Sequence, residues 1–286
     1  RSVAVESGIL NLNKPEGMSS ARAVSFVKRA TGLACGHMGT LDPLASGVLP
    51  VAVGNATRLF DYLLTKQKVY RALFAFGSET DTLDRAGEVV KSGWRIPSAA
   101  ELTEALASFI GEYDQMPPAY SAKSVNGVRA YTLARQGKEV TLTPKRVRVD
   151  ALELLGEERK GIFSVRIVCG GGTYIRSLAR DIAAQCGTVG YMAALVRERS
   201  GPFLLEKSIP PDALTKENWR SVLIPPDAVL DLPRFDLADA EAARCKNGVP
   251  VPSSAADGLY KLYLDGAFYG TAQVQQGKAR ARTKLV

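Results

Sequence analysis

The chain has 286 residues, a length that predicts about two domains at roughly 150 residues each. Hydrophobic residues make up 46% of it and charged residues 23%, which excludes a disordered or collagen-like protein. The formal net charge of +8 favours a polyanionic partner such as a nucleic acid, although a positive charge also serves solubility alone.

Histidine, cysteine and long apolar runs are scarce in this sequence. His37 is the single histidine, which excludes a His-rich metal site, and the four cysteines form no C-x-x-C pair, which disfavours zinc or disulfide frameworks. No apolar run approaches the roughly 20 residues that span a bilayer, and residues 1–6 lack the apolar centre of a secretory signal. We therefore expect a cytoplasmic protein without a membrane partner.

Helices and strands are predicted to alternate irregularly before residue 209. Ser19 or Ser20 caps a helix that runs to about residue 30 and ends at Gly32, and a capping box at residues 98–101 starts another. Residues 70–76 and 162–169 alternate side chains as half-buried strands do, and three glycines then lead into a further helix. Because βαβ spacing is absent, the pattern predicts the α+β class.

The domain boundary is predicted from proline content. Five of the 15 prolines fall between Ile209 and Pro233, and we interpret this segment as a linker. Behind it, two strand-like runs flank Asp265-Gly266, a dipeptide that adopts the positive φ angles of a tight hairpin turn. The sequence thus predicts a first domain over residues 1–230 and a small β domain over residues 231–286.

The stretch 36–50 contains three glycines and two prolines and is expected to be a loop. Its one acidic residue, Asp42, lies between Leu41 and Pro43 and is partly desolvated there, so it needs a nearby cation to stay ionised and nucleophilic. An Asx-turn is the alternative, because Asp-Pro is a common turn opener. His37 likewise is either a hydrogen-bonded loop residue or a catalytic one.

Two further segments combine features of binding sites with simpler structural explanations. Gly170–Gly172 precedes a helix, an arrangement that offers backbone N–H groups to an anion or merely permits a sharp turn. Arg176, in the first helical turn, is unfavourable for the helix dipole and is expected to serve a group outside the helix. Tyr70, close to Lys68 and Arg71, is either a stacking surface for an unpaired base or a packed strand residue.

Positive charge is concentrated in two stretches. Residues 121–150 contain seven basic and two acidic residues, a net +5 that suits either a loop lying along an RNA backbone or a solvated face. The second stretch is free of acidic residues and consists of Lys278, Arg280, Arg282 and Lys284.

Taken together and in this order, these segments closely resemble the TruB family of tRNA pseudouridine synthases. The resemblance covers nearly all of residues 8–205 and includes a Gly-His-x-Gly-x-Leu-Asp-Pro motif. One such segment can arise by chance, but the ordered set cannot. The segments that carry it are Gly8–Ser20, Gly36–Gly47, Lys68–Arg71, Thr80–Asp84, Pro117–Ala122, Gly172–Arg176 and Leu195–Arg197.

The resemblance implies roles for the residues that match the family's motifs. Asp42 would be the catalytic nucleophile, and Arg176 would pair with it and keep it ionised. His37 would enter the T-loop of tRNA in place of the extruded uridine, and Tyr70 would stack on the flipped base.

The remaining implied contacts surround the base and the RNA backbone. Tyr174 and Leu195 would line the base pocket, and Lys14 would support the loop or touch RNA. A basic insertion at about residues 124–146 would fold over the RNA as a mobile thumb. The implied fold is a mixed, mainly antiparallel sheet flanked by helices, followed by a short PUA-like RNA-binding β-barrel over residues 231–286.

The implied reaction is the isomerisation of uridine 55 in the T-loop to pseudouridine by base flipping, without a cofactor or metal. Asp42 would add to C6 of the base, capture C1′ of the sugar, or act through a glycal. Because the long terminal extensions of guide-RNA-dependent relatives are absent, we expect a monomer that modifies the tRNA T-stem-loop without an obligatory protein partner. The alternatives are guide-RNA-dependent modification and a non-catalytic protein that binds tRNA or assists its folding.

Overall fold

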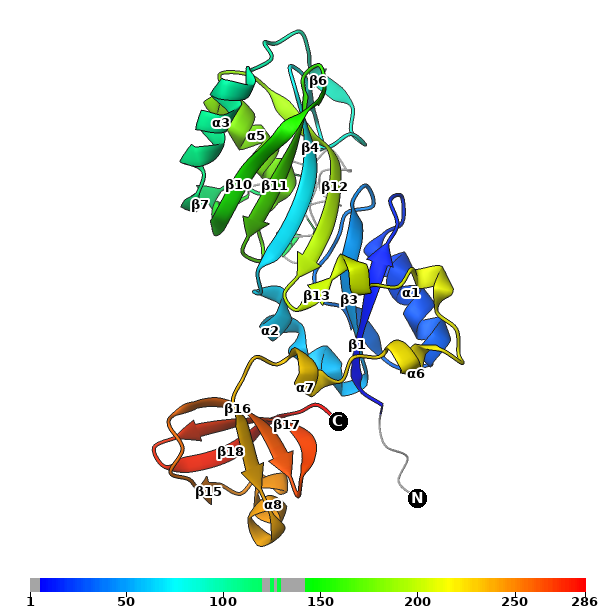
Figure 1. Cartoon of the computed structure of the whole chain (residues 1–286), viewed down its shortest axis with the longest axis vertical. Coiled ribbons are helices and arrows are strands. Elements are labelled where there is room, and N and C mark those ends of the chain that lie inside the picture. Colours follow the sequence, from blue (N-terminus) through cyan, green and yellow to red (C-terminus); the bar gives the residue numbers. More distant parts are fainter. Residues whose placement is uncertain (1–5, 120–123, 126–127, 130–141) are drawn as a thin grey trace.

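The computed structural model describes residues 6–119, 124–125, 128–129 and 142–286. Two large sheets organise this part of the chain, one of nine strands and one of five. Figure 1 shows the nine-stranded sheet with its helices at one end and the five-stranded sheet at the other. Among the described residues, none of the helices has the length and apolar character that a bilayer crossing requires.

The nine-stranded sheet runs in the order β1-β3-β12-β4-β11-β10-β7, with β2 added to β3 and β13 added to β12. Neighbouring strands are antiparallel except β3 and β12, which are parallel. The sheet therefore confirms the predicted α+β class. Its strands are β1 (Gly8–Lys14), β2 (Cys35–His37), β3 (Ser46–Val53), β4 (Lys68–Phe76), β7 (Gly111–Gln115), β10 (Lys145–Arg159), β11 (Ile162–Cys169), β12 (Gly190–Ser200) and β13 (Phe203–Leu204).

The helices of this part begin and end largely where their local sequence predicts. Helix α1 (Ser20–Thr31) has Ser19 as its N-cap and the left-handed Gly32 as its C-cap. Helix α3 (Ala99–Ser108) begins with the expected capping box. Helix α5 (Ile175–Gln185) follows the three glycines. It lies against β12, and α3 lies against β10 (Figure 1). The 3₁₀ helix η1 (Gly54–Leu59) and helix α2 (Phe60–Leu64) connect β3 to β4.

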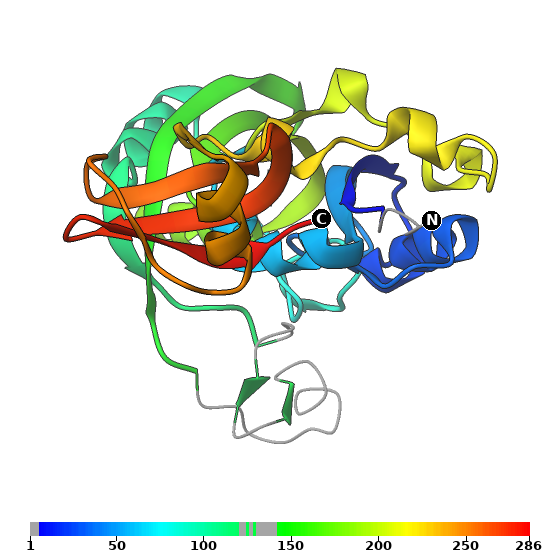
Figure 2. The same cartoon turned by 90° about the horizontal axis from the view of Figure 1, so that it is seen from below.

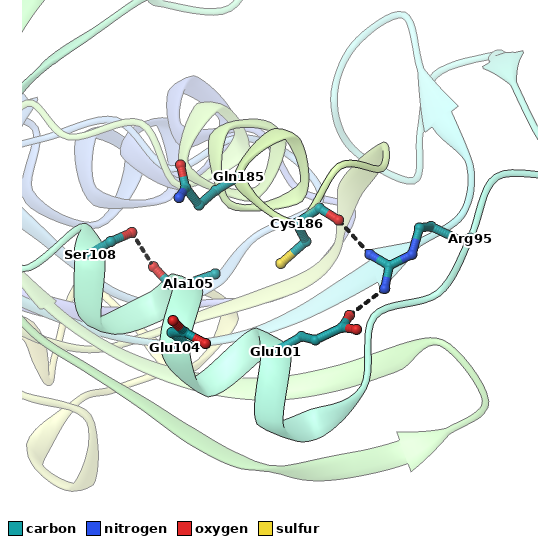
Figure 3. A pocket seen from close by; sticks show the side chains of 7 residues that line it. All are labelled: Arg95, Glu101, Glu104, Ala105, Ser108, Gln185 and Cys186. Atoms are coloured by element: carbon teal, nitrogen blue, oxygen red, sulfur yellow. Dashed lines mark hydrogen bonds and ion pairs between the residues drawn. The ribbon is translucent and has the colours of Figure 1, made fainter.

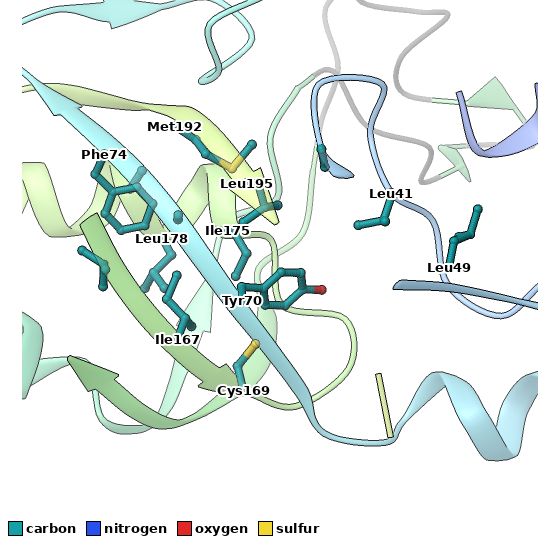
Figure 4. Packing of buried hydrophobic residues seen from close by; sticks show 14 of the residues in the cluster. Leu41, Leu49, Tyr70, Phe74, Ile167, Cys169, Ile175, Leu178, Met192 and Leu195 are labelled. Carbon is teal, nitrogen blue, oxygen red and sulfur yellow. The ribbon is translucent and has the colours of Figure 1, made fainter. Parts of the chain in front are cut away.

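The main hydrophobic cluster fills the space between the sheet and these helices. Phe74, Ile167 and Leu178 are fully buried in it, and they come from β4, β11 and α5. Figure 4 shows Tyr70 at the end of the same cluster, on the side that faces Leu41 and Leu49. The core thus extends to the loop that carries Asp42.

Two sequence predictions about loops were too broad. Residues 36–50 form a loop only over 38–45, because β2 and β3 pair on either side of it. Most of the predicted thumb lies outside the described residues, apart from β8 (Ser124–Val125) and β9 (Val128–Arg129), which stand away from the body in Figure 2. Residues 145 and 146, at the approximate end of the predicted thumb, pair with β7 as part of β10.

The linker interpretation of residues 209–233 is also wrong for most of that segment. Ile209 and Ile224 form β-bridges with β1, and Trp219 is 1% exposed within the main cluster. The prolines limit the segment to short helices that cover the edge of β1. These helices are η3 (Pro211–Ala213), α6 (Trp219–Val222) and α7 (Pro226–Val229), and the 3₁₀ helix η2 (Leu205–Lys207) precedes the segment.

The C-terminal sheet has the order β14-β16-β17-β18-β15. Asp265 and Gly266 have φ angles of 50° and 80°, so the predicted hairpin between β16 and β17 is confirmed. Leu285 is fully buried in a cluster that includes Ile9 and Met38, which attaches this sheet to the first one. The elements are β14 (Arg234–Leu237), α8 (Asp239–Lys246), β15 (Val251–Pro252), β16 (Gly258–Leu264), β17 (Ala267–Gln275) and β18 (Lys278–Lys284).

Short hairpin strands β5 (Glu79–Thr80) and β6 (Val89–Lys91) follow β4. Leu83 and Asp84 between them are joined to Met192 of β12 by backbone contacts. The Thr80–Asp84 segment also lies beside the start of α5, because the Thr82 carbonyl accepts a hydrogen bond from Arg176.

Candidate active site

The loop that carries Asp42 is fixed by hydrogen bonds on both sides of the aspartate. The Ser20 hydroxyl accepts from the Leu41 N–H at 2.9 Å and donates to the Leu41 carbonyl at 2.7 Å. The Ala45 N–H donates to the Asp42 carbonyl at 2.9 Å, which closes a turn through the main chain. The carboxylate of Asp42 is therefore not needed to form the turn.

Lys14 holds the same loop through its side chain. Its ammonium donates to the carbonyls of Pro15 at 2.9 Å, Met18 at 2.5 Å and Pro43 at 3.4 Å, and none of the residue is exposed. Burial lowers the pKa of Lys14 to about 8, and the nearby Asp42 charge opposes part of that change. These contacts tie the loop after β1 to the residue that follows Asp42.

Asp42 and Arg176 form an ion pair in which Arg176 Nε lies 2.9 Å from Asp42 Oδ2. The Arg176 side chain is 6% exposed and that of Asp42 is 37% exposed. Arg176 Nη1 also donates to the Thr82 carbonyl at 3.0 Å, so its orientation is fixed. The arginine in the first turn of α5 thus serves groups outside its helix, as its position in the helix dipole predicted.

Tyr70 lies in β4, a central strand of the sheet rather than an edge strand. Its side chain is 7% exposed, and Figure 4 shows its ring near Leu195 and Ile175, pointing toward the side of Leu41. Burial raises the pKa of the Tyr70 hydroxyl. Leu195, also 7% exposed, lies in β12 next to the strand of Tyr70.

His37 lies on strand β2, and Tyr174 lies at the start of helix α5. His37 is the last residue of β2, paired with Val51, and is partly exposed. Tyr174 is the N-cap residue of α5 and is partly exposed. The structure therefore places the seven predicted site residues on β1, β2, β4, β12, the 38–45 loop and the start of α5.

Gln115 contacts the predicted site residue Tyr174 and was not itself predicted from the sequence. Its amide oxygen accepts from the Tyr174 N–H at 2.9 Å, and its amide nitrogen donates to the Tyr174 carbonyl at 3.1 Å. The side chain is 1% exposed at the end of β7. No local signal in the sequence distinguishes it from a surface glutamine.

Arg197 and Lys68 are two further buried cations that the sequence did not assign. Lys68 donates to the carbonyls of Leu63, Leu64 and Lys66 at 3.2, 3.3 and 2.7 Å, which closes the end of α2. Its pKa is lowered to about 8 by burial. Arg197 donates to carbonyls of the Asp42 loop.

A second ion pair joins two segments that neighbour Asp42 and Arg176. Arg85 pairs with Glu16, and both side chains are about half exposed. Glu16 lies in the loop held by Lys14, and Arg85 follows the Thr80–Asp84 segment. The solvent-exposed pair is worth little energy, so it marks the proximity of the two segments rather than holding them.

A separate cavity of about 360 Å³ lies between α3 and the end of α5 (Figure 3). Arg95 crosses it, donating to the Cys186 carbonyl at 2.5 Å and pairing with Glu101. None of the seven predicted site residues lines this cavity. Within the described ranges, no group of three or more His, Cys, Asp or Glu side chains is arranged to hold a metal ion.

Comparison with solved structures defines the class of protein. A Cbf5–Nop10–Gar1 complex matches with a TM-score of 0.72 and 25% identity, over 98% of this chain and 85% of that one. An archaeal box H/ACA Nop10–Cbf5 complex matches with a TM-score of 0.71 and 25% identity, over 99% and 87% of the two chains. The chain has the pseudouridine synthase fold.

Sequence comparison defines the family within that class. The N-terminal domain of the TruB family of pseudouridylate synthases matches residues 28–175. A tRNA pseudouridine synthase B from Anaplasma marginale is 41% identical over 286 residues, which cover all of this chain and 87% of that protein. One from Acaryochloris marina is 41% identical and covers 97% of this chain and 98% of that protein. This chain belongs to the TruB family.

Proposed function

We propose that this chain is a tRNA pseudouridine synthase that acts on uridine 55 of the T-loop, with Asp42 as its nucleophile. The observation that carries the proposal is the Asp42 carboxylate, held 2.9 Å from Arg176 Nε while 37% of its side chain stays exposed. The guanidinium is almost fully buried, so it orients the carboxylate and balances its charge without blocking the exposed side. Membership in the TruB family supports the same reaction.

The chemistry is an isomerisation and balances within the nucleotide. The N1–C1′ bond breaks and a C5–C1′ bond forms, the hydrogen on C5 leaves as a proton, and N1 gains a proton. Asp42 acts on the sugar at C1′, on the base at C6, or through a glycal after loss of the C2′ proton. Each of these routes requires a carboxylate beside the nucleoside that has left the RNA stack.

The uridine reaches Asp42 by base flipping, which costs a few kcal/mol of unstacking, on the order found for other flipped bases. Tyr70 then stacks on the base, while Leu195 and Tyr174 line the pocket. Because Tyr70 is 7% exposed, the base reaches its ring only after side chains around the ring move. Stacking on the ring offsets part of the unstacking cost.

His37 and Lys14 differ in what they can touch. His37 is partly exposed at the start of the Asp42 loop, a position suited to entering the T-loop in place of the uridine. Lys14 has no exposed surface, and its three donors are bound to carbonyls. Of the two roles considered for Lys14, support of the loop therefore fits and RNA contact does not.

We also propose that residues 231–286 form a PUA-like RNA-binding domain beside a catalytic domain of residues 1–230. The alternating basic residues of β18 support RNA binding, since all four are exposed. A cavity of about 480 Å³ beside them is lined by three glutamines and two cations, with no acidic residue. Glutamine amides and cations suit bases and phosphates, respectively. The residues that line it are Gln273, Gln275, Gln276, Lys278 and Arg280.

The proposal includes action as a monomer in the cytoplasm, without a guide RNA or a protein partner. To test it, the purified chain alone is incubated with a bare T-stem-loop RNA, and pseudouridine is mapped by primer extension after carbodiimide treatment. A stop at uridine 55, absent with an RNA that carries cytidine there, is the expected result. Tight binding without a stop, even at stoichiometric protein, would instead identify a non-catalytic RNA-binding protein.

A further inference from the structure

Arg197 is a buried arginine whose guanidinium donates to three backbone carbonyls. It lies in β12 and is 2% exposed. Its Nε donates to the Val48 carbonyl at 2.8 Å, its Nη2 to the Gly39 carbonyl at 3.0 Å, and its Nη1 to the Thr40 carbonyl at 3.5 Å. None of the ion pairs among the described residues includes it.

These three carbonyls lie on both sides of the nucleophile in the chain. Gly39 and Thr40 fall between His37 and Asp42, and Val48 is in β3, just after the loop ends. The planar guanidinium therefore holds the entry and the exit of the loop with one rigid group. A lysine, with a single ammonium on a flexible stem, cannot reproduce this fork.

The backbone of Arg197 also determines how closely β12 approaches the loop. Gly47 pairs with Arg197 in the parallel bridge between β3 and β12. A Cβ at Gly47 would lie 2.3 Å from the Arg197 carbonyl oxygen, a distance that no real side chain tolerates. The loop thus meets Arg197 through both its side chain and its main chain.

Arg197 is next to Tyr70 as well. The two residues are partners in the antiparallel register between β12 and β4. The positive charge of Arg197 lowers the pKa of the Tyr70 hydroxyl and so opposes the effect of burial. The same arginine therefore contacts the loop of Asp42 and influences the ring on which the base is proposed to stack.

We propose that Arg197 is a positioning residue that fixes the Asp42 loop relative to Tyr70, so that the nucleophile meets the flipped nucleoside in a productive geometry. The proposal rests on the proposed function in its assignment of Asp42 and Tyr70, but the fixation of the loop is independent of the reaction. A misplacement of about 1 Å at a reacting group can cost about a hundredfold in rate. A side chain with 2% exposure has almost no surface for RNA, so binding is not its role.

The test compares Arg197→Lys with Arg199→Lys. Arg199 lies two residues further along the same strand, is exposed, and donates through Nε to the Gly201 carbonyl at 2.8 Å. Both substitutions keep the positive charge and remove a contact between a guanidinium and a carbonyl. Only Arg197 makes that contact with the Asp42 loop. Four quantities are measured for each variant: thermal unfolding, hydrogen exchange of peptides by mass spectrometry, the Kd for tRNA, and the single-turnover rate of pseudouridine formation.

For Arg197→Lys we expect a folded protein, faster exchange confined to residues 38–47, an unchanged Kd for tRNA, and a single-turnover rate lower by about a hundredfold. Arg199→Lys should match the wild type in all of these. Failure of Arg197→Lys to fold, faster exchange spread over α5 and the sheet, or a wild-type rate at saturating tRNA would overturn the proposal. If the wild type itself forms no pseudouridine, the proposed function fails, whereas the exchange measurement still decides whether Arg197 fixes the loop.

Discussion

Arg176 Nε lies 2.9 Å from Asp42 Oδ2, and the arginine is 6% exposed while the aspartate is 37% exposed. The buried guanidinium distinguishes this pair from surface ion pairs such as Arg234 with Asp236, in which both partners are 53% exposed. A buried cation that presents an accessible carboxylate suits catalysis better than it suits stability, because desolvating the arginine is costly. A change at either partner should therefore affect the reaction more than the fold.

Replacement of Arg176 by Lys should lower the single-turnover rate of pseudouridine formation by about a hundredfold or more, because lysine cannot orient the Asp42 carboxylate as the guanidinium does. Binding of tRNA, measured by filter retention, should change little, since the arginine is almost fully buried. Arg180→Lys is the matched control, one turn later on α5 in a pair with Asp181. Equal rates for the two variants would contradict the role assigned to Arg176.

Replacement of Gly47 by Ala should destabilise the protein far more than replacement of Gly32 by Ala. Both glycines have positive φ angles, 104° and 69°, so both substitutions carry backbone strain of about 1–2 kcal/mol. Only at Gly47 would the new Cβ collide with another strand, 2.3 Å from the Arg197 carbonyl, whereas nothing lies within 4 Å at Gly32. Urea unfolding measures both. Equal losses of stability would show that β12 does not approach the loop this closely.

The contribution of Lys14 and Lys68 to stability should grow as the pH rises from about 8 to 10.5. Their pKa values are lowered by burial from 10.5 to about 8, so in this window the folded protein loses protons that the unfolded chain keeps. The unfolded state then binds more protons, and the free energy of unfolding rises with pH.

The four cysteine thiols act in the opposite direction, because burial raises their pKa values. The informative quantity is therefore the difference between the wild type and a Lys68→Met variant, measured by urea unfolding across that pH window. The advantage of the wild type over the variant should widen with pH. A constant difference would mean that Lys68 titrates normally.

Replacement of Lys278, Arg280 and Arg282 by Gln should weaken tRNA binding and make it less salt-dependent. Each phosphate that the variant no longer neutralises lowers the slope of log K against log salt concentration by about 0.7 to 0.9. The single-turnover rate at saturating RNA should not change, because β18 carries none of the proposed catalytic residues. Lys246→Gln, an exposed cation on α8, is the control. An unchanged slope in the triple variant would remove β18 from the RNA-binding surface.

Features that depend on neighbouring residues were predictable from the sequence. The caps of α1 and α3 and the Asp265-Gly266 turn each involve residues within four positions of one another, and all were confirmed. The seven predicted site residues came from the resemblance to the TruB family. The spacing of residues alone did not decide whether Asp42 is a turn residue or a nucleophile.

Features that depend on distant residues were not predictable. Gln115 meets Tyr174 across 59 positions, and Arg197 meets Gly39 across 158. The proline-rich segment has the local composition of a linker. Its pairing with β1 is also long-range, because it joins Ile9 to Ile224 and Leu12 to Ile209. No local pattern marks a glutamine or an arginine as buried, and only the assembled sheet brings these partners together.

The proposed role of Asp42 as the nucleophile is tested most directly by tritium release from tRNA that contains 5-tritiated uridine, with Asp42→Asn compared to the wild type. Asp61→Asn, an exposed aspartate of α2, is the control. We predict that Asp42→Asn binds tRNA as tightly as the wild type and releases no tritium, while Asp61→Asn releases it at the wild-type rate. Undiminished release by Asp42→Asn would show that Asp42 is not the nucleophile.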